Sequence, residues 1–373
     1  MEHKLGLYIH VPFCISKCDY CDFYSLGYSK ENAEKYVEKI ISELNRWGAI
    51  LRCPADTLYF GGGTPSLLSA KQISRIIEAA KKNFVLEAAE ITLEVNPKED
   101  LRQFFIEVKN AGVNRISVGF QSGVDRELCA LSRRHKLSDA LRTVEDIKAA
   151  GIENFSLDLM LGIPYQTNDS LRKSLEIMTS LEPAHISAYL LSVEKGTPFY
   201  KKRDSLDIAD DETAEEYYLE TCNFLKEKGF ERYEISNFCK SGKVSRHNLK
   251  YWQGADYLGL GPAAHSRIGD KRFYYDKNLE QYLLNPKEIF EGVAGDFEEQ
   301  FMLNLRLSSG ICFEEIAHKY NGLNYMAAKN KADLFVKGGL MKKENNIYSL
   351  TDKGALVSNT VILELLEEFG QKK

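Results

Sequence analysis

The chain has 373 residues, 44% of them hydrophobic, and a formal net charge of −5 at pH 7. This length predicts one large domain with a small one, or two domains, because a single domain usually has about 100–200 residues. The mildly acidic balance argues against general nucleic-acid binding, and no apolar run reaches the roughly 20 residues that cross a bilayer. The first residues do not form a secretion signal, so a cytoplasmic location is expected.

Short apolar segments alternate with amphipathic segments along most of the chain. The expected strands cover residues 5–11, 57–60, 91–95, 115–118, 154–159 and 185–190. The expected helices cover residues 30–47, 69–83, 101–111, 137–150, 171–181 and 212–229, with Ser69 as a capping residue. This alternation predicts an α/β fold with a parallel sheet, either a partial, open barrel or an open doubly wound sheet. In both, functional side chains gather at the carboxyl ends of the strands.

The pattern changes in the last third of the chain. Residues 232–276 are rich in Tyr, Gly and His and show no clear period. Helices are expected at residues 301–307, 313–320 and 326–336, with a turn at Asn321-Gly322, a hairpin around Asn345-Asn346 and a last helix at 355–369. This order predicts a small winged-helix-like domain over residues 296–373. It lacks a strong basic excess, so protein contact or a lid role is expected rather than DNA binding.

Three of the eight cysteines, Cys14, Cys18 and Cys21, lie within eight residues directly after the first expected strand. Thiolates at this spacing can hold an iron–sulfur cluster, and three ligands on a four-iron cube leave one iron open for a small molecule. The flanking aromatic residues Phe13 and Phe23 favour this interpretation. The alternative is a zinc site, for which His10 is the nearby fourth ligand.

Two further features lie at the ends of expected strands. Three glycines at positions 61–63 would let the backbone approach a ligand closely, although an ordinary tight turn is the alternative. Glu94, Gln121 and Asp158 lie at or near the ends of successive strands, where their side chains can converge on one ligand. Each of them alone is more often a capping or solvated residue.

Taken in order, these segments resemble the radical S-adenosylmethionine (SAM) superfamily, in particular the oxygen-independent coproporphyrinogen III oxidase group. The matching segments are residues 8–23, 61–65, 92–97, 117–122 and 158–164, together with the C-terminal domain. The resemblance implies a partial (β/α)6 barrel over residues 1–290 and a [4Fe–4S] cluster on the three cysteines. It implies a SAM site formed by Tyr8, Tyr20, Gly62, Gly63, Thr64, Glu94, Gln121, Arg133 and Asp158, with Arg134 as an alternative to Arg133.

Two departures from the oxidases argue against decarboxylase activity. The oxidases carry a fourth cysteine two residues after the third, where this chain has Phe23. They also have a long extension before the first strand, whereas the first strand here is expected at residue 5.

Residues 247–252 match the HNxxYW signature of the HemW-type heme chaperones within this group. The match implies heme binding and delivery to acceptor proteins, with His247, Tyr251 and Trp252 as candidate heme contacts. From the hexapeptide alone, a hydrogen-bonded His247 and a core-packed Trp252 are the simpler interpretation. His265 and Cys239 are competing candidates for the iron ligand.

The sequence therefore supports the hypothesis of a radical SAM heme chaperone. Coproporphyrinogen III oxidase is the main alternative, and anaerobic heme breakdown is a weaker one. Whether SAM is cleaved or only bound stays open, as does the choice between a monomer and a dimer. Peripheral membrane association is compatible with the sequence.

Overall fold

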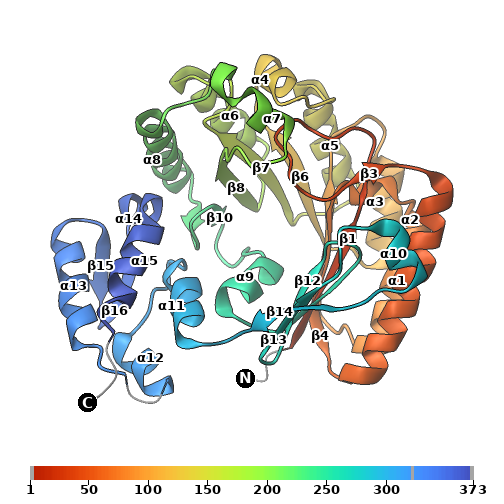
Figure 1. The fold of residues 1–373 in the computed structure, drawn as a ribbon. Coiled ribbons are helices and arrows are strands. Elements are labelled where there is room, and N and C mark those ends of the chain that lie inside the picture. Colours follow the sequence, from red (N-terminus) through yellow and green to blue (C-terminus); the bar gives the residue numbers. More distant parts are fainter. Residues whose placement is uncertain (1–3, 321–322, 370–373) are drawn as a thin grey trace.

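The computed structural model describes residues 4–320 and 323–369, and one twelve-stranded sheet dominates it (Figure 1). Its central strands are parallel: β1 (Leu5–Val11), β4 (Ala55–Gly62), β5 (Glu90–Val95), β6 (Arg115–Gln121), β7 (Phe155–Leu161) and β8 (His185–Leu190). The six expected strands are thus confirmed.

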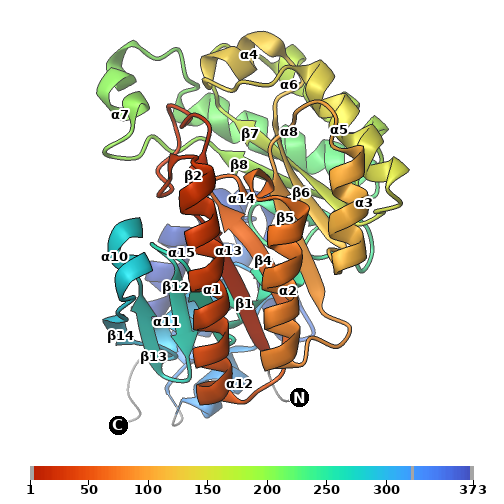
Figure 2. The ribbon, with the colours of Figure 1, turned by 90° about the vertical axis from the view of Figure 1, so that its right-hand side faces the viewer.

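Six main helices follow these strands: α1 (Lys30–Leu51), α2 (Ala70–Phe84), α3 (Arg102–Ala111), α5 (Leu137–Ala149), α6 (Asn168–Ser180) and α8 (Asp211–Glu227). They lie along the outer side of the curved sheet (Figures 1 and 2). A doubly wound sheet would carry helices on both faces, so that alternative is wrong and the partial barrel is confirmed. Ser69 caps α2 and shares a capping box with Gln72, as its position predicts.

Successive side chains along β1 point to opposite faces of the sheet. Leu7, Ile9 and Val11 are fully buried against the helical layer. Tyr8 and His10 lie between them in sequence and therefore face the hollow of the barrel. The concave side of the sheet consequently carries polar and aromatic side chains, while the convex side carries the core.

Residues 231–293, where the sequence shows little periodicity, widen the sheet at both edges. They form β9 (Glu231–Arg232), β10 (Asn237–Cys239), α9 (Arg246–Gln253), β11 (Tyr257–Leu260), β12 (His265–Ile268), β13 (Lys271–Tyr274), α10 (Leu279–Leu284) and β14 (Ile289–Val293). β10 pairs antiparallel with β8, whereas β11 pairs parallel with β1. Helix α9 therefore connects the two sides of the partial barrel. The strands have only two to five residues, which is too short for a period to show in the sequence.

The C-terminal part has a hydrophobic core of its own, formed by residues between Phe301 and Leu365. It contains α11 (Phe297–Leu305), α12 (Phe313–Lys319), α13 (Met326–Lys337), the β15–β16 hairpin (Met341–Glu344 and Ile347–Leu350), α14 (Asp352–Leu356) and α15 (Ser358–Leu366). The helices and hairpin match the winged-helix-like expectation. The single helix expected at 355–369 is wrong, because the chain breaks between α14 and α15 at Val357. The expected Asn321-Gly322 turn lies outside the described residues, and the domain boundaries stay predictions.

The C-terminal part packs against α8 and α9 of the barrel. Arg232 forms an ion pair with Asp352 at 2.8 Å, and its side chain is 10% exposed. The Asn304 amide donates a hydrogen bond to the backbone carbonyl of Trp252, 2.9 Å away. Trp252 thus lies at the junction of the two parts.

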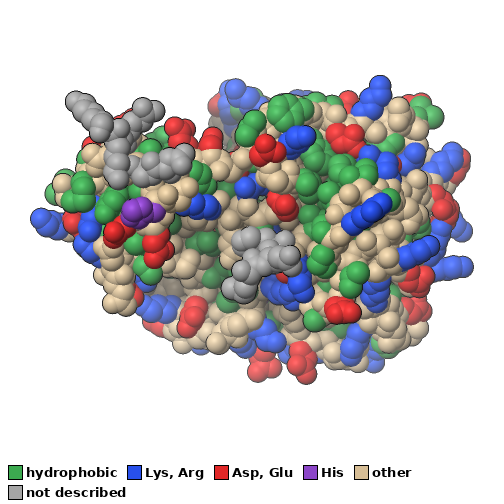
Figure 3. Space-filling model, turned by 90° about the horizontal axis from the view of Figure 1, so that it is seen from below, with side chains coloured by type: hydrophobic (Ala, Val, Ile, Leu, Met, Phe, Trp, Pro, Cys, Tyr) green, Lys and Arg blue, Asp and Glu red, His purple; other side chains and the backbone are tan. Residues whose placement is uncertain are grey.

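Two surface properties bear on possible partners. In the described ranges, no helix is long and apolar enough to cross a membrane. On the face seen from below, basic and acidic side chains are interspersed (Figure 3).

Candidate functional site

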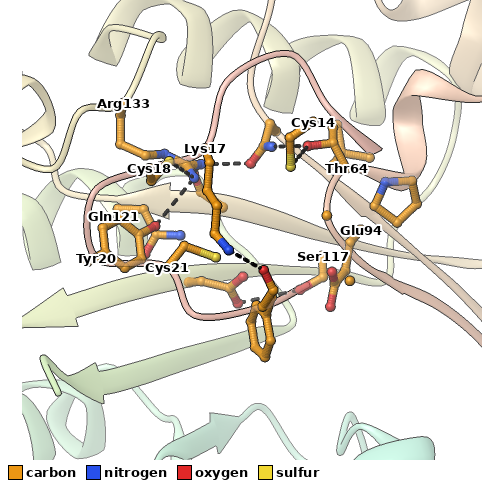
Figure 4. A pocket seen from close by; sticks show the side chains of 18 of the residues that line it. Cys14, Lys17, Cys18, Tyr20, Cys21, Thr64, Glu94, Ser117, Gln121 and Arg133 are labelled. Atoms are coloured by element: carbon orange, nitrogen blue, oxygen red, sulfur yellow. Dashed lines mark hydrogen bonds between the residues drawn. The ribbon is translucent and has the colours of Figure 1, made fainter. Parts of the chain in front are cut away.

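A cavity of about 390 Å³ opens at the carboxyl ends of the parallel strands. This is the edge at which ligands bind in barrels of this type. It is lined by Cys14, Cys18, Cys21, Tyr20, Gly62, Gly63, Thr64, Glu94, Gln121, Arg133 and Asp158 (Figure 4). The structure therefore brings together all three expected cluster ligands and eight of the nine expected SAM contacts.

The cysteines belong to one loop, residues 14–27, whose two ends are fastened together. β2 (Phe13–Cys14) pairs with β3 (Leu26–Gly27), and the Tyr28 amide donates to the Cys14 carbonyl at 3.1 Å. Farther along the loop, the Phe199 amide donates to the Asp19 carbonyl at 3.0 Å. These contacts hold a loop without regular structure over the mouth of the barrel.

The cysteine side chains fit a cluster better than a single metal ion. All three thiols are free and partly exposed to the same cavity. Among the described residues, no three His, Cys, Asp or Glu side chains are close enough together to hold one ion. His10, the proposed fourth zinc ligand, uses both ring nitrogens, with Tyr8 Oη at 3.1 Å and the Tyr24 carbonyl at 2.9 Å. A four-iron cube instead binds each thiolate on a different iron, which suits more widely spaced sulfurs.

Two glycines at the end of β4 allow the loop to approach the sheet. A Cβ on Gly63 would lie 2.6 Å from the Phe13 carbonyl oxygen and 3.1 Å from Cys14 Sγ. Gly62 has φ +108°, and a Cβ there would lie 2.8 Å from the His10 ring. Only glycine fits both positions without displacement, which explains the glycine run as more than an ordinary turn.

Arg133 connects the cysteine loop to the strand ends. Its Nη1 lies 3.8 Å from Cys18 Sγ and 3.4 Å from Tyr20 Oη. Its Nη2 donates to Asn96 Oδ1 and to the Gly119 carbonyl, both at 2.8 Å. Arg134 is exposed and lines only the neighbouring cavity, so Arg133 is the arginine of this site.

Two carboxyl groups lie in the polar half of the cavity. Burial raises the pKa of Glu94 to about 7, although Tyr59 Oη donates a hydrogen bond to it at 2.8 Å. Burial also raises the pKa of Asp158 to about 6, opposed by its hydrogen bond with Ser187. Groups that titrate near neutrality can accept hydrogen bonds from an ammonium or from hydroxyls.

Gln121 has a strained backbone. Its φ is +66°, and the β6–β7 pairing shifts register between Val118 and Gln121. A non-glycine residue in this region costs of order 1–3 kcal/mol and is typical of ligand sites. The strained residue therefore lies where β6 ends, and its side chain lines the cavity.

Sequence reasoning missed several residues that line the cavity. Asn96 bridges Arg133 and Thr64, to whose hydroxyl it donates at 2.9 Å. Ser117 donates to Asp158 at 3.4 Å from one strand away, and Tyr189 lines the far wall. Inward alternation with Gln121 could have identified Ser117, but the sequence alone gives no such signal for Asn96.

Tyr8 is the expected SAM contact that does not line this cavity. Its ring lies in the hollow of the barrel beside Tyr59 and His247 and faces a second cavity. A role in SAM binding stays a prediction for Tyr8.

The three candidate heme contacts on α9 are placed differently from one another. His247 is 1% exposed, with Nδ1 2.8 Å from Thr57 Oγ1 and Nε2 2.8 Å from Tyr251 Oη. Burial lowers the pKa of His247 to about 3, and the charge of Lys250 adds to the effect. Heme ligation by His247 stays a prediction, and it would require the ring to leave both partners. Tyr251 lines the second cavity, whereas Trp252 lies against the C-terminal part.

Comparison with known proteins gives the same family along the whole chain. Residues 8–178 match the model of the radical SAM superfamily, and residues 296–357 match the HemN C-terminal domain. A Bacillus subtilis protein named heme chaperone HemW is 33% identical over 377 residues, which cover 97% of this chain and 99% of that protein. The chain belongs to the HemW family of radical SAM proteins. Another HemW relative, from Escherichia coli, is 31% identical over 98% of both chains.

The fold of this HemW-family chain also matches a solved structure. Coproporphyrinogen III oxidase (HemN) from Escherichia coli superposes with a TM-score of 0.83, covering 98% of this chain and 90% of that one. The two are 22% identical, so the likeness concerns the fold. Membership of the radical SAM superfamily implies a [4Fe–4S] cluster and SAM. The cavity with its three thiols, close-approach glycines and polar wall fits both groups.

Proposed function

We propose that this protein is a heme chaperone, which binds heme and delivers it to acceptor proteins. The observation that carries the proposal is the end-to-end identity of 31–33% with proteins named heme chaperone HemW. Identity that covers both domains is stronger support than a match to the barrel alone, because the same barrel serves many reactions.

Phe23 supports this function over porphyrinogen decarboxylation. It stands where the oxidases carry a fourth cysteine, and its side chain is 62% exposed at the rim of the cluster cavity. A benzyl side chain offers neither a thiolate nor a proton. An exposed ring at this position is instead suited to contact with a flat apolar molecule.

The roles of the residues around the cluster and SAM follow from their placement. Cys14, Cys18 and Cys21 would hold the cluster, and Arg133 would balance the charge of their thiolates. The glycine run would leave room for SAM, with Glu94 and Asp158 as hydrogen-bond acceptors. When bound together, the cluster and SAM supply one-electron chemistry, and the protein positions them.

Coproporphyrinogen III oxidation is the second candidate, favoured by the match of residues 296–357 to the HemN C-terminal domain. The test is an anaerobic incubation of reconstituted protein with SAM, a reductant and coproporphyrinogen III. Porphyrins are then oxidised and analysed by mass spectrometry, with an active oxidase as a positive control. We expect unchanged substrate; loss of two carboxyl groups would contradict the chaperone proposal. The same incubation with heme in place of the porphyrinogen tests heme breakdown.

Delivery requires a partner, and we propose that heme passes to acceptor proteins from a cytoplasmic chaperone that contacts membranes only peripherally. Release is measured by mixing heme-loaded protein with apomyoglobin as a trap. We expect transfer within minutes, and heme that stays bound over hours would contradict a delivery role.

A further inference from the structure

A second cavity, of about 370 Å³, adjoins the cluster cavity on the concave side of the sheet. Phe23 lines both cavities, so the segment after Cys21 is the wall between them. The second cavity opens at the surface, where Phe23 and Lys277 are exposed. The second cavity is therefore open to solvent and lies beside the cluster site.

The walls of this second cavity are largely aromatic. Phe23 and Tyr24 come from the cysteine loop, Tyr251 from α9 and Tyr257 from β11. The Tyr251 and Tyr257 rings pack edge to face, with centroids 4.6 Å apart and planes at 88°. Aromatic walls of this kind offer flat apolar area to a planar ligand.

His265, at the start of β12, lines the same cavity and has one ring nitrogen available for a ligand. Its Nδ1 is 3.2 Å from the Glu291 carboxylate, and its ring stacks on Tyr274 at 5.1 Å. Among the described residues, its Nε2 has no hydrogen-bond partner, and its side chain is 47% exposed. A carboxylate on one nitrogen orients an imidazole and makes the other nitrogen a better metal ligand.

The other described histidines lack this combination. His10 and His247 have both nitrogens in hydrogen bonds. His135 and His185 are buried, at 6% and 0% exposure. His318 is exposed but lies on α12 of the C-terminal part, which does not line the second cavity.

A cationic side chain at the second cavity suits a ligand that carries carboxylate groups. Lys277 stands at the rim and, within the described ranges, forms no ion pair. Asp22, Asp276 and Glu291 are acidic groups nearby; Glu291 is paired with His265, and Asp276 accepts a hydrogen bond from the Lys277 backbone amide at 2.7 Å. The ammonium group of Lys277 is thus available to a carboxylate of the ligand.

We propose that the second cavity is the heme-docking site and that His265 Nε2 is the axial ligand of the heme iron. The macrocycle lies against the aromatic walls, and Lys277 pairs with a propionate. This inference rests on the proposed heme-chaperone function and assigns its site to residues other than His247. It also places heme directly beside the cluster cavity, with Phe23 between the two.

The test is a spectrophotometric heme titration of anaerobically reconstituted full-length protein. We expect His265→Ala to weaken binding at least tenfold and to lose the resonance Raman signature of histidine-ligated iron. His265→Gln, which keeps the contact with Glu291, should behave the same. His318→Ala is the matched control and should bind as the wild type does. Free imidazole should restore the signature in His265→Gly.

The outcomes separate this inference from the function on which it rests. If the wild type binds heme and His265→Ala binds equally tightly with the same signature, the docking site is wrong and the chaperone proposal stands. If the wild type shows no saturable heme binding, both fail. Because His265 is half exposed, near-ultraviolet circular dichroism should show an unchanged fold in all variants.

Discussion

The guanidinium of Arg133 lies 3.8 Å from the sulfur of Cys18, and it is the only described arginine that lines the cluster cavity. Its second nitrogen is fixed by Asn96 and by the Gly119 carbonyl. A cation held by the rigid strand ends therefore stands beside the loop that carries the thiols. This arrangement places a fixed positive charge beside the thiols that would hold the cluster.

Replacing any one of Cys14, Cys18 or Cys21 by alanine should abolish the assembled cluster, because each thiolate binds its own iron. Iron and sulfide analysis after anaerobic reconstitution measures this, and we expect less than a tenth of the wild-type content. Cys129→Ala is the matched control, since Cys129 is exposed on α4 (Asp125–Ala130) and does not line the cavity. A variant of the three that retained full iron content would remove that cysteine from the site.

Substitutions at Gly62 and Gly63 should separate an effect on SAM binding from an effect on cluster assembly. Gly63→Val places a side chain against the Phe13 carbonyl and Cys14, so cluster content should fall. At Gly62 the three atoms nearest to an added Cβ all belong to the His10 ring rather than to the cysteine loop, so Gly62→Val should weaken SAM binding about tenfold while the cluster persists. Isothermal titration with SAM and iron analysis measure the two effects. Gly27→Ala, with nothing within 4 Å of its Cβ, is the control. Unchanged SAM affinity in Gly62→Val would exclude the glycines from the SAM site.

The raised pKa of Glu94, about 7, predicts a pH-dependent stability. The folded state holds this proton more tightly than the unfolded chain, so the contribution to stability is complete below pH 4.5 and is lost as pH rises to 7. Glu94→Gln keeps an acceptor for Tyr59 and cannot ionise. Urea unfolding should therefore show the variant to be more stable than wild type at pH 8, by about 1–2 kcal/mol, with little difference at pH 5. A variant less stable at pH 8 would contradict this.

His247 should be a determinant of stability. His247→Ala leaves Thr57 and Tyr251 without their partner, and removing a buried hydrogen-bonded ring costs about 2–4 kcal/mol. The pKa of His247 is lowered to about 3, so its effect on stability runs opposite to that of Glu94. The stability that the neutral ring contributes is complete above pH 6.5 and is lost as pH falls toward 3. Urea unfolding at pH 7 measures the loss, with His318→Ala as the neutral comparison. Equal stability of the two variants would show that the α9 contacts contribute little.

Much of this architecture could be predicted from the sequence, because strands and helices of ordinary length carry clear periodicity. The start of α1 and the whole of β1 fall where the pattern of apolar residues places them. β9 to β13 could not be predicted, since two to four residues show no period and their partners are distant in sequence. The break at Val357 between α14 and α15 was equally hidden.

Some residues of the candidate site could likewise be predicted from the sequence, and others could not. Cysteine spacing and the glycine run identify the cluster loop, because both are local in the sequence. The contact of Asn96 with Arg133 and Thr64 depends on how three strand ends meet, and the sequence does not contain that geometry. The HNxxYW signature locates α9, but only the structure shows His247 with both nitrogens engaged while His265 has one free.

The central claim is that this protein binds heme as cargo, and a heme titration of the anaerobically reconstituted wild type tests it most directly. We predict a saturable Soret absorbance change with one heme per chain and an iron ligated by protein. A linear change without saturation, equal to that of heme in buffer, would contradict the account.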